Sequence, residues 1–181
     1  MSTPFIPHPD KLAPHGCVSL IGMAAAGKTT IGRELSALTG WGQLDADTII
    51  ESSYGAILQT ISTGLDKEAF LDLEGDIISL INVKRCIIST GGSAVYREKA
   101  MAHLRTLGPI VYIAVPLPII LKRIARKPER GLAIAPGQTV EDLYEERVKL
   151  YEKYANFTVE GGEEPASVYA ESIREWMASK P

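Results

Sequence analysis

Short apolar runs alternate along the chain with longer segments in which apolar residues recur every three or four positions. The runs predict β-strands at residues 17–21, 41–45, 85–89, 110–115 and 156–159. The periodic segments predict helices at residues 30–38, 48–54, 56–61, 67–81, 98–107, 118–125, 140–155 and 165–177. Because strands that alternate with helices form parallel sheets covered on both faces, we predict an α/β three-layer sandwich around a five-stranded parallel sheet.

Two segments lack this pattern. Residues 1–15 contain four prolines and no apolar core, which predicts a flexible tail rather than a signal peptide. Residues from about 126 to 137 combine prolines, glycines and basic side chains with little periodicity, as is typical of a mobile lid. We therefore expect residues 16–181 to form a single domain that carries a lid.

The composition narrows the class of protein. Nineteen Lys and Arg residues stand against 22 Asp and Glu, a formal net charge of −3, without the basic footprint of a nucleic-acid-binding protein. No apolar stretch reaches the roughly 18 residues that span a bilayer. Cys17 and Cys86 lie in apolar runs, which favours core side chains over a disulfide or a zinc site. We expect a monomeric, cytoplasmic protein that binds neither nucleic acid nor membranes.

One segment carries a specific chemical signal: Gly22-Met23-Ala24-Ala25-Ala26-Gly27-Lys28-Thr29 fits the phosphate-binding pattern G-x-x-x-x-G-K-[ST]. It lies between a predicted strand and a predicted helix, the context in which this P-loop works; a glycine-rich turn with a surface lysine is the weaker interpretation. The glycines let backbone N–H groups face phosphate oxygens, Lys28 supplies a positive charge, and Thr29 supplies a hydroxyl for Mg²⁺. The sequence therefore predicts a P-loop NTPase-type fold that binds ATP and Mg²⁺.

Polar residues follow two further predicted strands, at the edge where parallel sheets bind ligands. Asp45 and Asp47 could serve a metal and an acceptor hydroxyl, although Asp47 would also suit the N-cap of the next helix. The segment Thr90-Gly91-Gly92-Ser93 could bring backbone N–H groups close to a ligand, or could be an ordinary strand-to-helix turn.

Two arginines are candidates for binding anions. Arg130, in the predicted lid, could neutralise a transferring phosphoryl group, or could be a solvated loop residue. Arg147 could pair bidentately with a carboxylate, or could be an i,i+4 surface partner on its helix.

The order of these segments resembles that of the shikimate kinases, from about Cys17 onward. The matching segments are Gly22–Thr30 with Ile31-Gly32-Arg33-Glu34-Leu35, Asp45-Ala46-Asp47, Phe70 with Glu74, Thr90-Gly91-Gly92, Arg123, Arg130, and Arg147 with Leu150-Tyr151.

The resemblance implies a role for many of the matched residues. Lys28 and Arg130 would hold the transferring phosphate, and Thr29 and Asp45 would serve the magnesium ion. Asp47 would bind the acceptor hydroxyls and could take the proton. The remaining nucleotide contacts would come from Gly22, Ala24, Ala25, Ala26, Gly27, Thr30 and, against the adenine, Arg123. The acceptor pocket would include Gly91, Gly92 and, for its carboxylate, Arg147.

The sequence departs from the family pattern in three segments. Leu71 stands where the family has an arginine that helps to bind the substrate carboxylate, and Ser93 stands where it has a third glycine. The lid sequence reads Arg130-Gly131-Leu132-Ala133 in place of Arg-Pro-Leu-Leu. Leu71 and Ser93 are therefore expected to shape the acceptor pocket.

These observations predict an ATP- and Mg²⁺-dependent kinase, of a kind used in amino-acid biosynthesis, that phosphorylates a hydroxyl of a small carboxylate-bearing metabolite. Shikimate and a hydroxy-amino acid such as homoserine are both open as acceptors, the second because Leu71 would shrink the pocket and Asp47 could meet an ammonium. A non-catalytic nucleotide-binding regulator and a nucleoside monophosphate kinase fit the set of residues less well.

Overall fold

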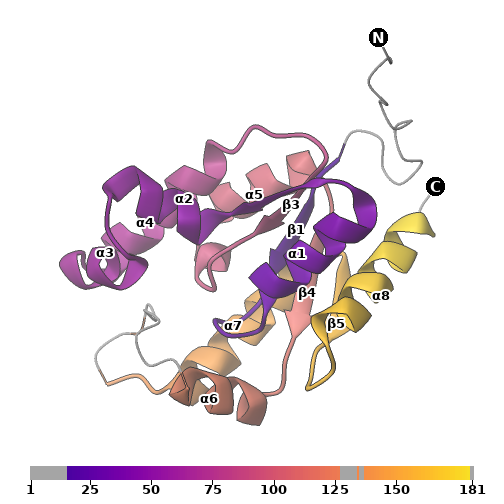
Figure 1. Ribbon diagram of the computed structural model, residues 1–181. Helices are drawn as coiled ribbons and strands as arrows, with labels where there is room; N and C mark the ends of the chain where they lie inside the picture. The colour runs from indigo at the N-terminus through magenta and orange to yellow at the C-terminus, as the bar shows by residue number, and fades with distance from the viewer. Residues whose placement is uncertain (1–15, 127–133, 135–136, 180–181) are drawn as a thin grey trace.

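Five parallel strands form the central layer of the protein. The computed structural model describes residues 16–126, 134 and 137–179. Its strands are β1 (Val18–Ile21), β2 (Gly42–Asp45), β3 (Cys86–Ser89), β4 (Ile110–Ala114) and β5 (Phe157–Glu160). They pair in the order β2-β3-β1-β4-β5, which places β1 at the centre (Figure 1).

The helices lie close to the segments that the apolar periodicity predicts. They are α1 (Lys28–Thr39), α2 (Ala46–Tyr54), α3 (Leu58–Gly64), α4 (Lys67–Ser79), α5 (Glu98–Leu107), α6 (Leu117–Ala125), α7 (Val140–Tyr154) and α8 (Ala166–Ala178). A short 3-10 helix, η1 (Ala94–Tyr96), was not predicted, because three residues carry no periodic signal. Pro118 lies in the first turn of α6, where its missing N–H costs no helical hydrogen bond.

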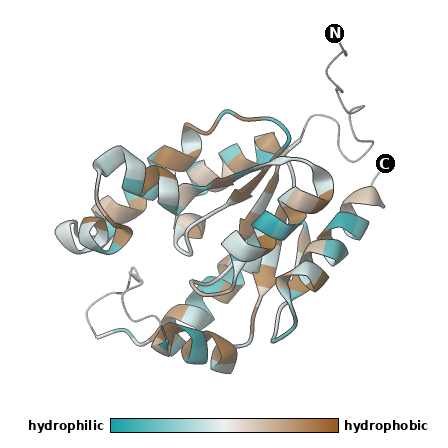
Figure 2. Cartoon of the chain, viewed as in Figure 1, coloured by the Kyte–Doolittle hydropathy of each residue, from teal (hydrophilic) through white to brown (hydrophobic). Residues whose placement is uncertain are grey.

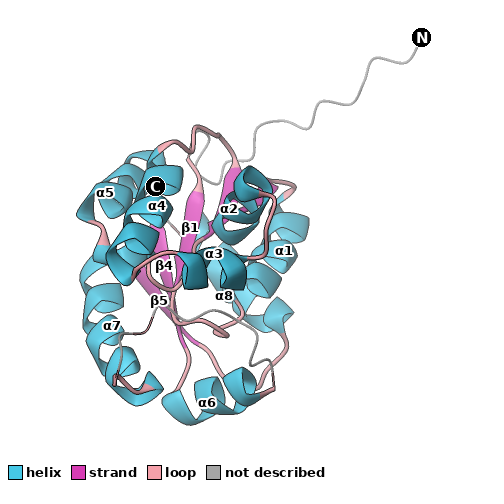
Figure 3. Cartoon of the chain, turned by 90° about the vertical axis from the view of Figure 1, so that its left-hand side faces the viewer, coloured by secondary structure: helices cyan, strands magenta, loops and turns pink. Residues whose placement is uncertain are grey.

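The helices cover the sheet on both faces. Helices α1 and α8 pack against each other on one face, and α5 and α7 lie on the other, so that the strands run between two helical layers in Figure 3. The helices α2, α3 and α4 extend beyond the β2 and β3 side of the sheet in Figure 1. The predicted α/β three-layer fold is confirmed.

Burial explains why the central strands appear as short apolar runs. Every residue of β1 and β3 is buried, and these strands are predominantly apolar at the centre of Figure 2. Cys17, which directly precedes β1, and Cys86, the first residue of β3, are both buried, as their apolar surroundings indicated. A smaller apolar cluster of Ile50, Ile61 and Phe70 holds the α2–α4 segment together.

The sheet topology brings three loops to one edge. Strand β1 pairs with both β3 and β4, so the connections on its two sides lead in opposite directions across the sheet. Parallel sheets bind ligands at such a point, beyond the carboxyl ends of the strands. Ser89, the last residue of β3, is aligned with Leu20 of β1 and Asp45 of β2. The loops that follow these three strands therefore start at the same level.

Some expectations fall on parts of the chain that the structure leaves undescribed. The predicted tail, residues 1–15, and most of the predicted lid, including Arg130, lie outside the described residues. Among the helices that are described, none combines the length and apolarity needed to cross a membrane.

Gly108 provides a test of this packing, because it admits no side chain. A Cβ at Gly108, where φ is +157°, would lie 1.9 Å from the backbone oxygen of Cys17 at the start of β1. We expect Gly108→Ala to lower the free energy of unfolding by at least about 3 kcal/mol, since the start of β1 would have to move.

Gly40 is the matched control for this measurement by urea unfolding. It also has a positive φ, +66°, but a Cβ there would meet nothing within 4 Å. Gly40→Ala should cost only about 1–2 kcal/mol from backbone strain. Equal losses in the two variants would contradict a close approach of Gly108 to β1.

Candidate active site

The P-loop curls tightly at the end of β1. Gly22 (φ +145°) passes so close to β4 that a Cβ would lie 2.7 Å from the backbone oxygen of Ile113. Gly27 (φ +94°) has a left-handed conformation at the N-cap of α1. The ammonium of Lys28 donates hydrogen bonds to the backbone oxygens of Gly22 (2.7 Å) and Met23 (2.8 Å). The curl therefore brings the positive charge of the lysine against the phosphate-binding loop.

A hydrogen bond joins the P-loop to the end of β2. Thr29 Oγ1 donates to Asp45 Oδ2 at 2.6 Å, and Asp45 Oδ1 accepts from the backbone N–H groups of Asp47 and Thr48. Asp45 is thus the N-cap of α2. The alternative in which Asp47 is the cap is wrong, because β2 leads into the helix without a loop and the cap falls two residues earlier.

The Thr29 and Asp45 oxygens suit a magnesium ion. Mg²⁺ prefers hard oxygen ligands and usually binds through one or two protein groups together with water and nucleotide phosphates. In the described part of the chain, no group of three or more His, Cys, Asp or Glu residues could form an all-protein metal site. The paired hydroxyl and carboxylate are therefore suited to a metal that arrives with a nucleotide.

Two glycines let the β3 loop pass between the P-loop and the acidic residues. A Cβ at Gly92 would lie 3.1 Å from the backbone nitrogen of Ala24 and 3.0 Å from Arg147 Nη1. A Cβ at Gly91 would lie 2.9 Å from Asp47 Oδ1 and would collide with Glu74 Oε1. Any larger residue at either position would separate the P-loop from these charged side chains.

Arg147 lies at the centre of this arrangement rather than on the surface. Its side chain, only 1% exposed, lies 5.2 Å from the ring centroid of Tyr96, and its Nε donates to the Tyr96 hydroxyl at 3.4 Å. One turn further along α7, the Tyr151 hydroxyl donates to the backbone oxygen of Gly92 at 2.6 Å. The alternative interpretation of Arg147 as a surface partner is wrong, because this face of α7 packs against η1 and the glycine loop.

Glu74 is a buried acid in the same region. Only 3% of it is exposed, and its Oε2 accepts a hydrogen bond from the Ser93 hydroxyl. Burial raises the pKa of the Glu74 carboxyl to about 7, and the charge of Asp47 acts in the same direction. The Ser93 hydrogen bond and the charges of Arg147 and Lys28 act in the opposite direction. Glu74 therefore titrates near neutral pH.

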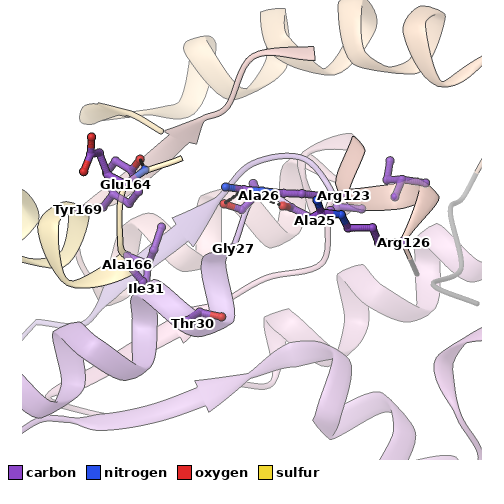
Figure 4. Close-up of a pocket in the computed structure, with 12 residues that line it drawn as sticks. Ala25, Ala26, Gly27, Thr30, Ile31, Arg123, Arg126, Glu164, Ala166 and Tyr169 are labelled. Carbon is purple, nitrogen blue, oxygen red and sulfur yellow. Dashed lines mark hydrogen bonds between the residues drawn. The ribbon is translucent and has the colours of Figure 1, made fainter. Parts of the chain in front are cut away.

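The P-loop also borders a cavity that extends toward α6 and α8. Its volume is about 370 Å³, and it is lined by Ala24, Ala25, Ala26, Gly27, Thr30, Ile31, Arg123, Ile124, Arg126, Glu164, Ala166 and Tyr169. In Figure 4 the P-loop residues lie between the arginines of the α6 segment and the β5–α8 segment. Arg123 donates hydrogen bonds to the backbone oxygens of Ala25 (3.2 Å) and Gly162 (2.6 Å) and thereby joins these walls.

Many of the predicted site residues lie together around a small cavity. A smaller cavity between the P-loop and the β3 loop is lined by Ala24, Ala25, Gly27, Lys28, Thr29, Thr30, Asp47, Thr90 and Gly92. Leu71 is 2% exposed on α4, one turn before Glu74. Arg130 lies outside the described residues and is not part of this geometry.

Sequence reasoning assigned no role to Tyr96, Glu74 or Tyr169. Glu74 was noted only as part of a matching segment, although an acid on the apolar stripe of α4 that includes Phe70 and Ile78 could have indicated a buried charge. Tyr96 and Tyr169 gave no such signal, since isolated tyrosines are common on packed surfaces. The Tyr169 hydroxyl accepts hydrogen bonds from the N–H groups of Gly162 and Glu164, an arrangement that only tertiary folding creates.

Comparison with known proteins agrees with this geometry. A family model for shikimate kinase matches residues 24–178. The shikimate kinase of Nitratidesulfovibrio vulgaris is 33% identical over 167 residues, which cover 89% of this chain and 95% of that protein. The shikimate kinase of Pasteurella multocida is 34% identical over 160 residues, or 86% and 91% of the two chains. The chain belongs to the shikimate kinase family.

Solved structures of the family have the same fold. The chain is similar to shikimate kinase from Acinetobacter baumannii in complex with shikimate, with a TM-score of 0.82, 31% identity and coverage of 91% and 93% of the two chains. Shikimate kinase from Aquifex aeolicus gives a TM-score of 0.75 with 28% identity, over 90% and 96%. As a member of this family, the protein is an ATP-dependent kinase that phosphorylates a hydroxyl group.

The buried carboxyl of Glu74 should make stability depend on pH. Its pKa is about 7 in the folded protein and near 4.5 in the unfolded chain, so the folded state binds more protons between these values. The free energy of unfolding of the native protein should therefore fall as the pH rises from 4.5 to 7. Relative to the native protein, Glu74→Gln should gain about 3 kcal/mol across this window.

Urea unfolding at four pH values from 4.5 to 7.5 would measure this gain. Glu145→Gln, at an exposed position of α7, controls for the loss of one acidic side chain. A difference between Glu74→Gln and the native protein that stays constant with pH would contradict the raised pKa of Glu74.

Proposed function

We propose that the protein transfers the γ-phosphoryl group of Mg²⁺-bound ATP to a hydroxyl of a small metabolite that carries a carboxylate. The observation that supports this most strongly is the position of Arg147. Its buried guanidinium lies beside Gly92, where a Cβ would meet both Arg147 Nη1 (3.0 Å) and the P-loop backbone nitrogen of Ala24 (3.1 Å). An acceptor whose carboxylate pairs with Arg147 would thus lie within reach of a nucleotide on the P-loop.

Each side of this site would have its own task. Lys28, with the backbone N–H groups of the P-loop, would hold the phosphates, and the cavity that Arg123 lines would take the nucleoside. Asp47, whose Oδ1 faces Gly91, would orient the acceptor hydroxyl and could accept its proton. Arg130, from the predicted lid, would add positive charge at the transferring phosphate. Positioning and charge neutralisation supply most of the catalysis in phosphoryl transfer.

Thr29 and Asp45 would hold the magnesium ion, which supplies charge neutralisation for the phosphates. We expect Asp45→Asn to raise the Mg²⁺ concentration that gives half-maximal activity by about tenfold, because a neutral amide binds Mg²⁺ less well than a carboxylate. An ADP-release assay with a titration of MgCl₂ at fixed ATP would measure the change.

Asp66→Asn is the matched control for this titration. Asp66 also caps a helix, since its Oδ1 accepts from the N–H group of Ala69, but it lies at the start of α4 rather than beside Thr29. An equal shift in both variants would mean that loss of a helix cap, not loss of a metal ligand, is responsible.

Shikimate and a hydroxy-amino acid such as homoserine are the two acceptor candidates. Membership of the family supports shikimate, and the Acinetobacter baumannii relative was solved with shikimate. The charges around the glycine loop support the second candidate. Leu71 is buried and apolar, while the carboxyl groups of Asp47 and Glu74 both face Gly91, so an ammonium would find acidic partners there.

Leu71→Arg would discriminate between the two acceptors. A second cation in the pocket should favour shikimate, which carries a carboxylate and no ammonium, over homoserine, which carries both. The ratio of kcat/KM for shikimate to kcat/KM for homoserine should therefore rise at least about tenfold, which is the effect of one charged hydrogen bond. An ADP-release assay with a panel of hydroxy acids and hydroxy-amino acids measures both values.

The same assay on the native protein tests the proposal itself. Leu80→Arg, at an exposed position just after α4, controls for the added charge outside the pocket. Efficient turnover of shikimate by the native protein, with no change in preference in Leu71→Arg, would remove the hydroxy-amino acid candidate. Tight ATP binding without turnover of any acceptor would refute a kinase function.

A further inference from the structure

The turn between β5 and α8, residues 161–165, forms part of the cavity that borders the P-loop. Glu164 lines this cavity together with Ala166 and Tyr169 of α8, across the P-loop from the arginines of α6 (Figure 4). The turn reads Gly-Gly-Glu-Glu-Pro, and both glutamates are exposed, so side-chain packing does little to fix its conformation. Its hydrogen bonds to neighbouring elements therefore determine where this part of the cavity lies.

Tyr169 accepts two hydrogen bonds from this turn. Its hydroxyl oxygen lies 2.7 Å from the backbone nitrogen of Gly162 and 3.0 Å from that of Glu164. The side chain is only 8% exposed and belongs to the first turn of α8. The N-cap residue of this helix is Pro165, whose side chain has no polar atom that could accept these hydrogen bonds instead. The tyrosine therefore attaches the turn to α8.

Gly162 connects this tyrosine to Arg123. Its N–H group donates to the Tyr169 hydroxyl, and its carbonyl oxygen accepts from Arg123 Nη2 at 2.6 Å. The same guanidinium donates through Nη1 to the backbone oxygen of Ala25 in the P-loop at 3.2 Å. A chain of hydrogen bonds therefore runs from α8 through the turn and the arginine to the phosphate-binding loop, and each contact restricts the position of the next.

We propose that Tyr169 is a positioning residue for nucleotide binding: its hydroxyl holds Gly162 so that the carbonyl of that residue aligns Arg123 along the cavity. Tyr169 acts through the turn and the arginine, and the phosphate contacts of the P-loop do not depend on it. Its effect is therefore confined to ligands that carry a nucleoside. This inference rests on the proposed function, in which the cavity takes the nucleoside of ATP.

Tyr169→Phe tests the proposal, because it removes only the hydroxyl. Isothermal titration calorimetry on the full chain measures Kd for two probes, the ATP analogue AMP-PNP and tripolyphosphate, which has the phosphates without the nucleoside. We expect Kd for AMP-PNP to rise about tenfold, because the turn and the arginine lose their preorganised positions. Kd for tripolyphosphate should change less than about twofold, and this retained binding also shows that the variant is folded.

A double-mutant cycle with Arg123→Met tests the route of the effect. If Tyr169 acts through the arginine, Tyr169→Phe in the Arg123→Met background should change Kd for AMP-PNP by less than about twofold. Two fully additive effects would mean that the tyrosine does not act through Arg123, and would overturn the proposal.

Two control variants separate the hydroxyl of Tyr169 from hydroxyls and contacts in general. Tyr144→Phe removes a hydroxyl on α7 that donates to the backbone oxygen of Val115 at 3.1 Å. Lys122→Gln breaks the exposed ion pair of Lys122 with Glu163 (2.9 Å), which joins α6 to the same turn. Both variants should bind both probes with a Kd within about twofold of that of the native protein.

The possible failures are distinguishable because the binding test needs no acceptor. A native protein that binds AMP-PNP but phosphorylates no acceptor refutes the proposed kinase function and leaves the calorimetric test intact. A native protein that binds AMP-PNP no more tightly than tripolyphosphate overturns the inference, since the cavity then takes no nucleoside. A Tyr169→Phe variant in which both Kd values stay the same, or both rise by the same factor, also overturns it, the second result showing a purely structural role.

Discussion

The close approach of the β3 loop to the P-loop is the constraint on which the site depends. Because Gly92 has no Cβ, the backbone of Ala24 and the guanidinium of Arg147 can both lie close to it. In the same way, the absence of a Cβ at Gly91 leaves room for the carboxyl groups of Asp47 and Glu74. A side chain at either glycine would push the P-loop apart from these charged side chains, and the proposed phosphoryl transfer would tolerate little separation of the reacting groups.

The balance of buried charge is the second organising feature. Arg147 and Glu74 are both nearly inaccessible to water, and an isolated charge of either sign would be costly there. Tyr96 stabilises the arginine through its ring and hydroxyl, while the Ser93 hydroxyl and a raised pKa reduce the cost of burying Glu74. Leu71, which is buried and apolar on the same helix as Glu74, adds no charge to this balance.

Much of the fold could be predicted from the sequence because the central strands β1, β3 and β4 are buried and form short apolar runs. Pro118 identified the first turn of α6. Helix boundaries and caps were less predictable. Asp45, not Asp47, caps α2, and the sequence alone does not show at which residue β2 ends and the helix begins. The site roles of Lys28, Thr29 and Asp47 stay predictions, although their positions around the glycine loop agree with them.

A local motif carries its own chemistry, so Gly22–Thr29 identified the phosphate-binding loop and the order of the later segments indicated the family from the chain alone. Contacts between distant segments were decided only by tertiary folding. The burial of Arg147, its contact with Tyr96 and the hydrogen bond from Ser93 to Glu74 join residues up to 51 positions apart. Their energies depend on solvent exclusion and on the distance between charges, which are properties of the packed molecule and leave no periodic trace in the sequence.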